Sequence, residues 1–102
     1  MFFTLKQNNS GGVFAVDDNV DKHVIIEART AKLANAIAET IGIYFDGCDY
    51  GIDCNCCGDR WYPVSNGSGT NTPLIYGKPP KSHYRIHYLD GRIEREYTGS
   101  YL

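Results

Sequence analysis

The stretch from Cys48 to Trp61 limits more than any other what this chain can fold into. It holds all four cysteines and the only tryptophan of the sequence. Cys54 and Cys57 are separated by two residues, and Gly58 follows. This C-x-x-C-G spacing is typical of a zinc knuckle, because two thiolates so placed curl round one ion and the glycine permits the tight turn behind them. The stretch therefore predicts a tetrahedral zinc site.

A closed tetrahedral site needs two further ligands. Cys48 precedes the knuckle closely enough to fold back as the third, and Cys56, His83 and His87 are the candidates for the fourth. On one face of a strand the two histidines would lie about 13 Å apart, so at most one of them can join the cysteines. This favours Cys56, or a solvent molecule, as the fourth ligand. The predicted ligands of one structural zinc per chain are Cys48, Cys54, Cys56 and Cys57.

Three other states of the cysteines stay open: free structural thiols, a disulfide and a reactive thiol at Cys57. The even number of cysteines permits a disulfide framework. However, residues 1–8 lack the long apolar core of a signal peptide, and the cytosol would keep the thiols reduced. A free thiolate is disfavoured by the neighbouring acidic residues and by the lack of a basic residue between them. These acidic residues are Asp46, Asp49, Asp53 and Asp59.

Length and charge predict one small domain over residues 1–102. A chain of 102 residues buries only a thin core, which a metal ion or oligomerisation would stabilise. No apolar run approaches the length of a membrane span, so we expect no membrane association. Residues 1–59 carry four Lys or Arg and nine Asp or Glu, a net charge of −5, whereas residues 60–102 carry six and three, a net charge of +3. The two halves should attract one another on folding.

One helix is expected among several strands. Residues 2–7, 13–16, 23–28 and 43–47 are predicted to form strands, and the first two are expected to form a hairpin. The Val-Ile-Ile run of the third segment can be buried on both faces. The helix is predicted over 31–41. Its cap is Thr30, its stop is Gly42, and its apolar face is Leu33, Ala34, Ile37, Ala38 and Ile41.

The C-terminal residues predict a hairpin around a two-residue Asp90-Gly91 turn. The register would place His87 opposite Glu94 and Arg85 opposite Glu96, on a polar face. It would also place Tyr84 opposite Tyr97. With Trp61 packed into the core, these elements predict an α+β fold: an antiparallel sheet of about five strands, one packed helix and a Cys-rich loop.

The run from Tyr44 to Tyr62, which contains D-C-x-C-C-G-D-R-W at residues 53–61, resembles a group of small uncharacterised tailed-bacteriophage proteins. The opening residues 6–12 and the ending residues 87–91 are similar in style, so the resemblance extends over most of the chain. It implies an accessory protein made inside a bacterial host, and hence a location in the host cytoplasm. It implies no activity and no active-site residues.

The sequence favours a protein-interaction or inhibitor module over an enzyme. It contains no nucleotide-binding loop, nucleophile elbow or H-E-x-x-H motif. We expect the partner to be a host protein, contacted through the polar loop 65–81 and the acidic surface around residues 46–59. The alternative is a protein that binds single-stranded nucleic acid, or a small nucleotide between protomers, through basic and aromatic residues. These residues are Lys78, Lys81, Arg85, Arg92, Arg95, Tyr76, Tyr84 and Tyr88.

Overall fold

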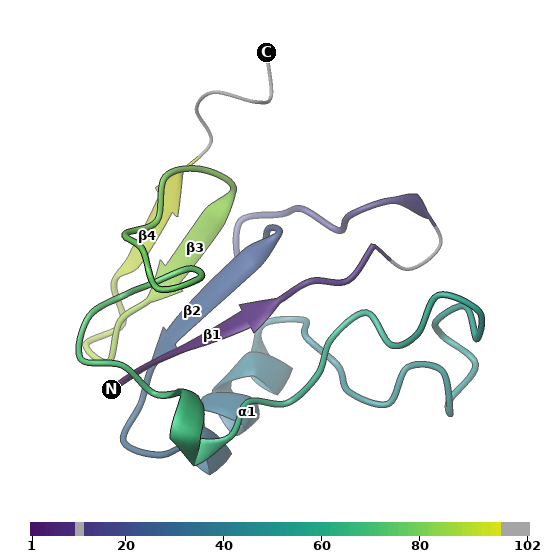
Figure 1. Ribbon diagram of the computed structural model, residues 1–102, viewed down its shortest axis with the longest axis horizontal. Helices are drawn as coiled ribbons and strands as arrows, with labels where there is room; N and C mark the ends of the chain where they lie inside the picture. The colour runs from purple at the N-terminus through teal and green to yellow at the C-terminus, as the bar shows by residue number, and fades with distance from the viewer. Residues whose placement is uncertain (10–11, 97–102) are drawn as a thin grey trace.

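The computed structural model describes residues 1–9 and 12–96. Part of the predicted turn at 8–12, and the predicted Tyr97 partner of Tyr84, lie outside these residues. The elements are β1 (Phe2–Lys6), β2 (His23–Glu27), α1 (Ala31–Thr40), the 3-10 turn η2 (Asn66–Ser68), β3 (Tyr84–His87) and β4 (Ile93–Glu96). They form an α+β fold with one four-stranded sheet in the order β1-β2-β3-β4 (Figure 1). The sheet is mixed, because β2 and β3 are parallel. The sequence predicted about five strands, all antiparallel. Among the described residues the sheet has four strands, and the β2–β3 pair is parallel.

β2 is a central strand buried on both faces, as predicted from its Val-Ile-Ile run. All three of these side chains are fully buried. β1 pairs antiparallel with β2, and not with residues 13–16 as predicted. The latter residues form no strand, and the side-chain amide of Gln7 binds the main chain of Ala15 at 2.6 Å and 2.9 Å instead. The predicted hairpin fails because burying β2 on both faces stabilises more than pairing a short, exposed segment would.

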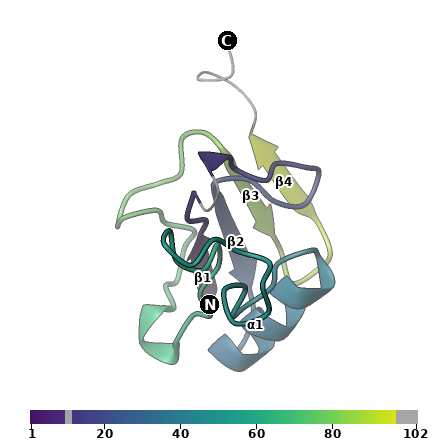
Figure 2. The same ribbon diagram turned by 90° about the vertical axis from the view of Figure 1, so that its right-hand side faces the viewer.

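α1 lies on one face of the sheet (Figure 2). The Thr30 hydroxyl accepts a hydrogen bond from the Leu33 N–H at 3.2 Å, and Gly42 has a φ of +101° just beyond the helix, so the predicted cap and stop are confirmed. The buried residues of the helix are Ala31, Ala34 and Ala38. Leu33 is 49 % exposed, so its place on the predicted apolar face is wrong. The predicted strand at 43–47 is absent: these residues are irregular, and Ile43 packs into the core.

The two faces of the sheet carry separate apolar clusters. The cluster under α1 contains Trp61, which confirms its predicted place in the core. The opposite face contains Ile25, Tyr84 and Ile86, with Ile75 packed against them. In Figure 1 the segment between η2 and β3 crosses in front of this second face while α1 lies behind the sheet. Each face is therefore covered, which explains how β2 is buried on both sides.

The C-terminal hairpin differs from its predicted register by one residue. His87 lies opposite Ile93 and not Glu94, and Arg85 lies opposite Arg95. A one-residue shift changes which side chains face each other along the whole pair.

The loop of this hairpin explains the shift. The Tyr88 N–H donates to the Arg92 carbonyl at 2.9 Å, and the Gly91 N–H donates to the Tyr88 carbonyl at 3.0 Å. The connection therefore has three residues, 89–91, and not two. Gly91 has a φ of +92°, the left-handed conformation that a three-residue hairpin loop requires.

Arg85 and His87, which the sequence predicted on a polar face opposite glutamates, are buried against residues 17–21. The Arg85 Nη1 lies 3.0 Å from the Asp21 carboxylate, and its Nε and Nη2 donate to the Asp17 carbonyl. The His87 Nε2 lies 2.8 Å from the Asn19 carbonyl, and burial lowers the pKa of this imidazole. The buried pair of Asp21 and Arg85 joins the acidic first half of the chain to the basic second half, as the charge distribution predicts.

Replacing Arg85 by methionine should destabilise the fold strongly. The change removes the guanidinium 3.0 Å from Asp21, whose side chain is fully buried. We expect a loss of about 3–5 kcal/mol in the free energy of unfolding, measured by urea denaturation. Arg29→Met, at an exposed position before α1, is the matched control and should cost less than about 1 kcal/mol. Adding Asp21→Asn to Arg85→Met should restore part of the loss. Equal stability of the two single variants would contradict this role for the pair.

Candidate metal centre

Residues 46–59 form a cysteine lobe that extends beyond the β1 edge of the sheet and contains no helix or strand (Figure 1). Its first turn is closed by the Gly47 carbonyl, which accepts hydrogen bonds from the N–H groups of Ile52 and Asp53 at 2.8 Å and 3.0 Å. A Cβ on Gly47 would overlap the Asp53 carboxylate, so the close approach requires glycine at this position.

The second turn of the lobe contains the knuckle sequence. The Cys54 carbonyl accepts hydrogen bonds from the N–H groups of Cys57 and Gly58, both at 3.1 Å. Gly58 has a φ of +86°, so the tight turn predicted from the C-x-x-C-G spacing is present. The turn places the side chains of Cys54 and Cys57 on the same side of the chain.

Two of the four aspartates hold the base of the lobe. Asp53 is buried and accepts hydrogen bonds from the Tyr44 hydroxyl at 2.8 Å and from the Arg60 N–H at 2.7 Å. Burial, reinforced by the bond to Asp53, raises the pKa of Tyr44. The Asp59 carboxylate accepts from the Cys48 N–H at 2.9 Å. These carboxylates therefore have structural partners, whereas Asp46 and Asp49 remain exposed.

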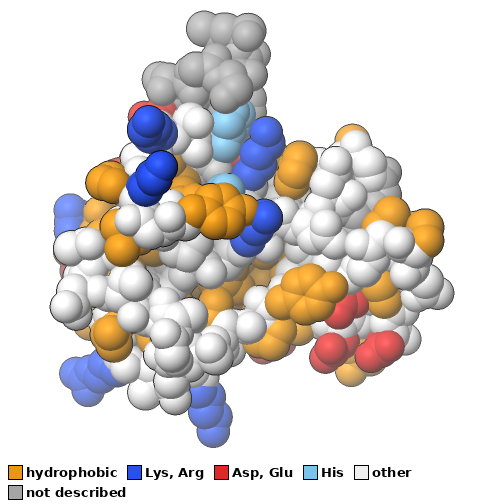
Figure 3. Space-filling model, in the orientation of Figure 1, with side chains coloured by type: hydrophobic (Ala, Val, Ile, Leu, Met, Phe, Trp, Pro, Cys, Tyr) orange, Lys and Arg blue, Asp and Glu red, His pale blue; other side chains and the backbone are white. Residues whose placement is uncertain are grey.

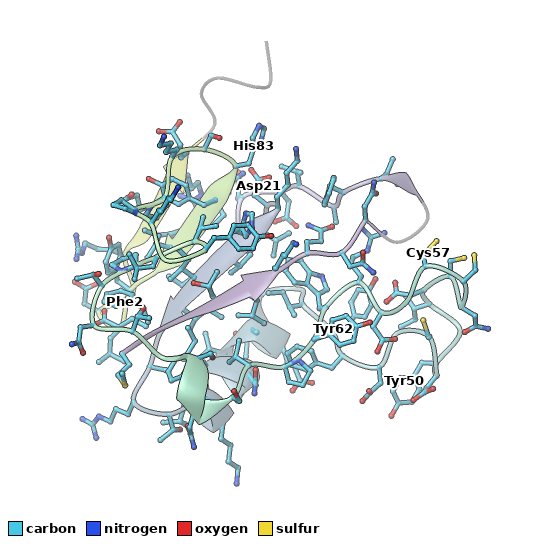
Figure 4. The ribbon with its side chains drawn as sticks, viewed as in Figure 1. Phe2, Asp21, Tyr50, Cys57, Tyr62 and His83 are labelled. Carbon is cyan, nitrogen blue, oxygen red and sulfur yellow. The ribbon has the colours of Figure 1, made fainter. Side chains whose placement is uncertain are left out.

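The thiols of Cys54, Cys56 and Cys57 gather at the tip of the lobe, where Figure 4 labels Cys57. The Sγ atoms of Cys54 and Cys56 are 2.9 Å apart, those of Cys56 and Cys57 are 3.8 Å apart, and all three lie within 4.8 Å of one another. Zn–S bonds of about 2.3 Å in a tetrahedron hold sulfur atoms about 3.8 Å apart. The three thiols could therefore hold a metal ion after a small adjustment of Cys54 and Cys56.

Cys48 and the two histidines lie outside this group of three. The Cys48 Sγ faces the Cys54 carbonyl at 3.5 Å. His87 binds the loop before β2, and the His83 Nδ1 lies 3.7 Å from the Asp21 carboxylate, so both histidines are held by residues outside the lobe. Among the described residues, three of the four predicted ligands are thus brought together, and Cys48 would have to turn toward them.

The electrostatics of the thiols differ within the lobe. Hydrogen bonds from the thiols of Cys56 and Cys57 lower the pKa of Cys54 to about 7. The hydrogen bond to Cys54 raises the pKa of Cys56 to about 11. Desolvation, followed by the hydrogen bond and charge of Asp59, raises the pKa of Cys48 to about 11. The expected effect of the aspartates therefore acts on Cys48, whereas at Cys54 the neighbouring thiols dominate. The tip therefore contains one readily ionised thiol, Cys54, beside Cys56, whose proton a cation would have to displace.

The sequence did not predict that the lobe exposes large apolar side chains. Tyr50 is 76 % exposed, Ile52 is 61 % exposed and Tyr62, just after the lobe, is 55 % exposed. The Tyr62 hydroxyl lies against Gly58 of the second turn, so this ring belongs to the same surface. The sequence signal for this exposure was Tyr50-Gly51-Ile52, two large apolar residues in a short turn between two cysteines, where a small lobe has little core to bury them.

Comparison with known proteins places the chain in a family. Residues 1–101 match a family model described as Domain of unknown function (DUF7296). The chain belongs to this family. The DUF7296 match spans the cysteine lobe and the sheet alike, and it says nothing about an origin in a phage, which stays a prediction. No curated protein and no solved structure matches this DUF7296 chain. In the described part of the chain, no helix is long and apolar enough to cross a membrane.

Proposed function

We propose that this DUF7296 chain is a non-catalytic protein-binding module. The observation that carries the proposal is the exposure of Tyr50, Ile52 and Tyr62 on or beside one small lobe. Exposed apolar residues that gather on one surface mark interaction sites, and tyrosine is favoured there because its ring is apolar and its hydroxyl is polar. Figure 4 shows Tyr50 and Tyr62 on the side of the molecule that also carries Cys57.

The partner would be a protein with basic residues around an apolar patch. Asp46 and Asp49 are exposed beside the tyrosines, and acidic side chains adjoin apolar ones in this region of the space-filling view (Figure 3). Electrostatic complementarity of this kind steers association and selects partners. In the phage context that the sequence resemblance implies, the partner is a protein of the host cytoplasm, and binding redirects or inhibits it.

One structural zinc ion would hold the tip of the lobe. The ligands would be the thiolates of Cys54, Cys56 and Cys57, with Cys48 turning in as the fourth. The close approach of the first three supports this assignment. Four thiolate ligands leave no position for a water molecule, so the ion would stabilise the lobe and would not catalyse a reaction. The clip matters because Cys56 and Cys57 are exposed and have little core around them.

Protein purified without chelator should contain about one zinc per chain by elemental analysis. Cys57→Ser should remove the zinc and lower the thermal stability, because it takes a ligand from the closed site. Asn55→Ser, in the same turn but without a thiol, is the matched control and should keep the metal. Cys48→Ser should weaken zinc retention if Cys48 is the fourth ligand. A folded, metal-free protein with four titratable thiols would refute the zinc, and the cysteines would then be packed or reactive thiols.

The protein-binding role is tested by capture from bacterial lysate with the tagged chain. A partner should be retained by the wild type and lost with Tyr50→Ser/Ile52→Ser, which removes two exposed apolar side chains from the lobe. Val13→Ser/Leu33→Ser changes two exposed apolar residues elsewhere and should keep the partner. Retention should fall as salt concentration rises, because Asp46 and Asp49 contribute. Capture that is the same for both double variants would contradict the proposed surface.

A second candidate function is the binding of a small phosphorylated nucleotide, which one pocket favours. This pocket, of about 470 Å³, is lined by Tyr76, Lys78, Lys81 and His23 among others. The Tyr76 ring is exposed, and the Lys6 Nζ lies 5.1 Å from its centroid. Burial and the charge of Lys6 lower the pKa of His23. A base could stack on the ring while the lysines contact phosphate.

The longer surface predicted for single-stranded nucleic acid is interrupted. Arg85 and Tyr84 are buried, and the Arg92 guanidinium lies 2.9 Å from Asp90. A nucleotide-sized ligand therefore suits the pocket better than an extended strand does.

Calorimetric titration with adenosine diphosphate tests this second function. Binding should be lost with Tyr76→Ala and weakened by Lys78→Gln/Lys81→Gln, because these variants remove the stacking surface and the phosphate contacts. Lys32→Gln, on the exposed side of α1, should leave it unchanged. No heat of binding with the wild type at millimolar nucleotide would dismiss this function and leave the protein-binding role.

A further inference from the structure

The outer edge of β1 has unpaired main-chain groups. The Met1 carbonyl accepts a hydrogen bond from the Ala28 N–H, and the Gln7 N–H donates to the Lys22 carbonyl. The main-chain N–H and C=O groups of the odd-numbered residues of β1 therefore point toward β2. The main-chain groups of the even-numbered residues point away from β2, and on that side Phe2 exchanges two hydrogen bonds with Thr70. Within the described chain, the N–H and C=O groups of Thr4 and Lys6 have no hydrogen bond on that side. An open strand edge of this kind is a template for pairing with another chain.

Both ends of this open edge are closed by the same segment of the chain. Residues 60–70 run alongside β1 and contact it at Thr70, next to Phe2, and at the Arg60 carbonyl, which accepts from the Asn8 N–H at 2.7 Å. Between these two contacts the segment bends away through η2 (Figure 1). Phe2 and Asn8 are six residue steps apart, which is about 20 Å of strand. The stretch between them therefore suits about five residues of extended chain.

A groove lies between β1 and this segment. Its volume is about 650 Å³, within the range of ligand-binding sites. The apolar residues that line it are Phe14, Tyr62, Pro63 and Val64, together with Leu5, whose side chain is buried in the core. Lys6 is the only charged residue in its lining. The Lys6 ammonium lies over the Tyr76 ring and forms no ion pair with a carboxylate among the described residues.

We infer that this groove binds a short extended peptide of a partner protein as an added antiparallel strand on β1. Thr4 and Lys6 would each exchange two main-chain hydrogen bonds with the peptide, continuing the antiparallel pairing that Phe2 already has with Thr70. The inference rests on the proposed protein-binding role and names the form of the partner segment.

The lining of the groove selects the side chains of the peptide. The residue opposite Lys6 should be acidic, because it would pair with the only charge in the groove. The residue opposite Leu5 should be apolar, because alternate side chains of the added strand point to the apolar wall. A second copy of β1 is a poorer occupant, since residues 60–70 of its own chain lie along the same edge of each copy.

The probe is a blocked pentapeptide, acetyl-valine-glutamate-valine-threonine-valine-amide, titrated into the full chain and followed by NMR. In the antiparallel register its glutamate and threonine face Lys6 and Thr4. We expect slowed amide hydrogen exchange at these two positions. N-methylation of the peptide's glutamate or threonine should weaken binding about tenfold, because it removes a hydrogen bond to β1. N-methylation of the central valine, whose N–H points away from β1, should leave binding unchanged.

Protein variants give a second, independent readout. Thr4→Pro removes an outward N–H that takes no part in the β1–β2 pairing, so it should abolish binding while the fold is kept. Thr4→Val is the control. Like the proline variant it lacks the hydroxyl, but it keeps the main-chain N–H and should therefore bind the peptide normally. Lys6→Glu should prefer a peptide with lysine in place of glutamate.

Three results would overturn the inference: no binding of the pentapeptide at millimolar concentration, equal effects of the three N-methylated peptides, or equal binding by Thr4→Pro and Thr4→Val. The lysate capture through Tyr50 and Ile52 does not depend on this groove. A partner held by the lobe, together with failure of the peptide, would therefore reject the groove alone, whereas loss of both would reject the protein-binding role as well.

Discussion

The side chain of Gln7 joins three parts of the structure that have no strand pairing with one another. It is buried, and its amide uses four hydrogen bonds: Nε2 donates to the carbonyls of Ala15 and Asp21, while Oε1 accepts from the Ala15 N–H and from the Arg60 Nη1. A buried amide with every hydrogen-bonding position occupied costs little and specifies one arrangement, whereas one left half satisfied would be unfavourable. Gln7 thereby holds the 13–21 segment and the exit of the cysteine lobe against the end of β1.

The two proposed binding surfaces depend on this junction. Arg60 continues from Gln7 into the lobe, where its N–H binds Asp53 and its Nε donates to the Tyr44 hydroxyl. The Asn8 side chain donates to the carbonyls of Cys57 and Asp59 at 2.8 Å and 3.1 Å. The base of the lobe is therefore fixed by protein hydrogen bonds. At the tip, Cys56 and Cys57 are exposed, and a zinc ion held by the thiols would add stabilisation there.

The sequence predicted the parts of the fold that depend on local chemistry. The helix begins after Thr30, which caps it, and stops before Gly42, which adopts the left-handed conformation. The Val-Ile-Ile run marks the central strand. The errors come from contacts between distant residues. The parallel β2–β3 pair, and Arg85 buried against Asp21, are invisible in a local pattern, because nothing next to Arg85 shows which loop will cover it. The hairpin register failed for a smaller reason, since Asp-Gly also suits a three-residue loop.

The candidate site was predictable to a similar degree. The C-x-x-C-G spacing located the turn and the close approach of Cys54 and Cys57, because that geometry depends on a few consecutive residues. The position of Cys48 depends on the intervening turn and on Asp59, so spacing alone could not fix it. The exposed tyrosines and the open edge of β1 depend on which residues the rest of the chain leaves uncovered, and therefore required the structure.

The central claim is that the lobe of a protein-binding module is closed by a zinc–thiolate clip. X-ray absorption at the zinc edge, on protein as purified, tests it most directly, because it counts the sulfur ligands of the ion. The account predicts a shell of four sulfur atoms at about 2.3 Å. A shell dominated by nitrogen or oxygen, or a protein that is fully folded with no zinc to measure, would contradict it.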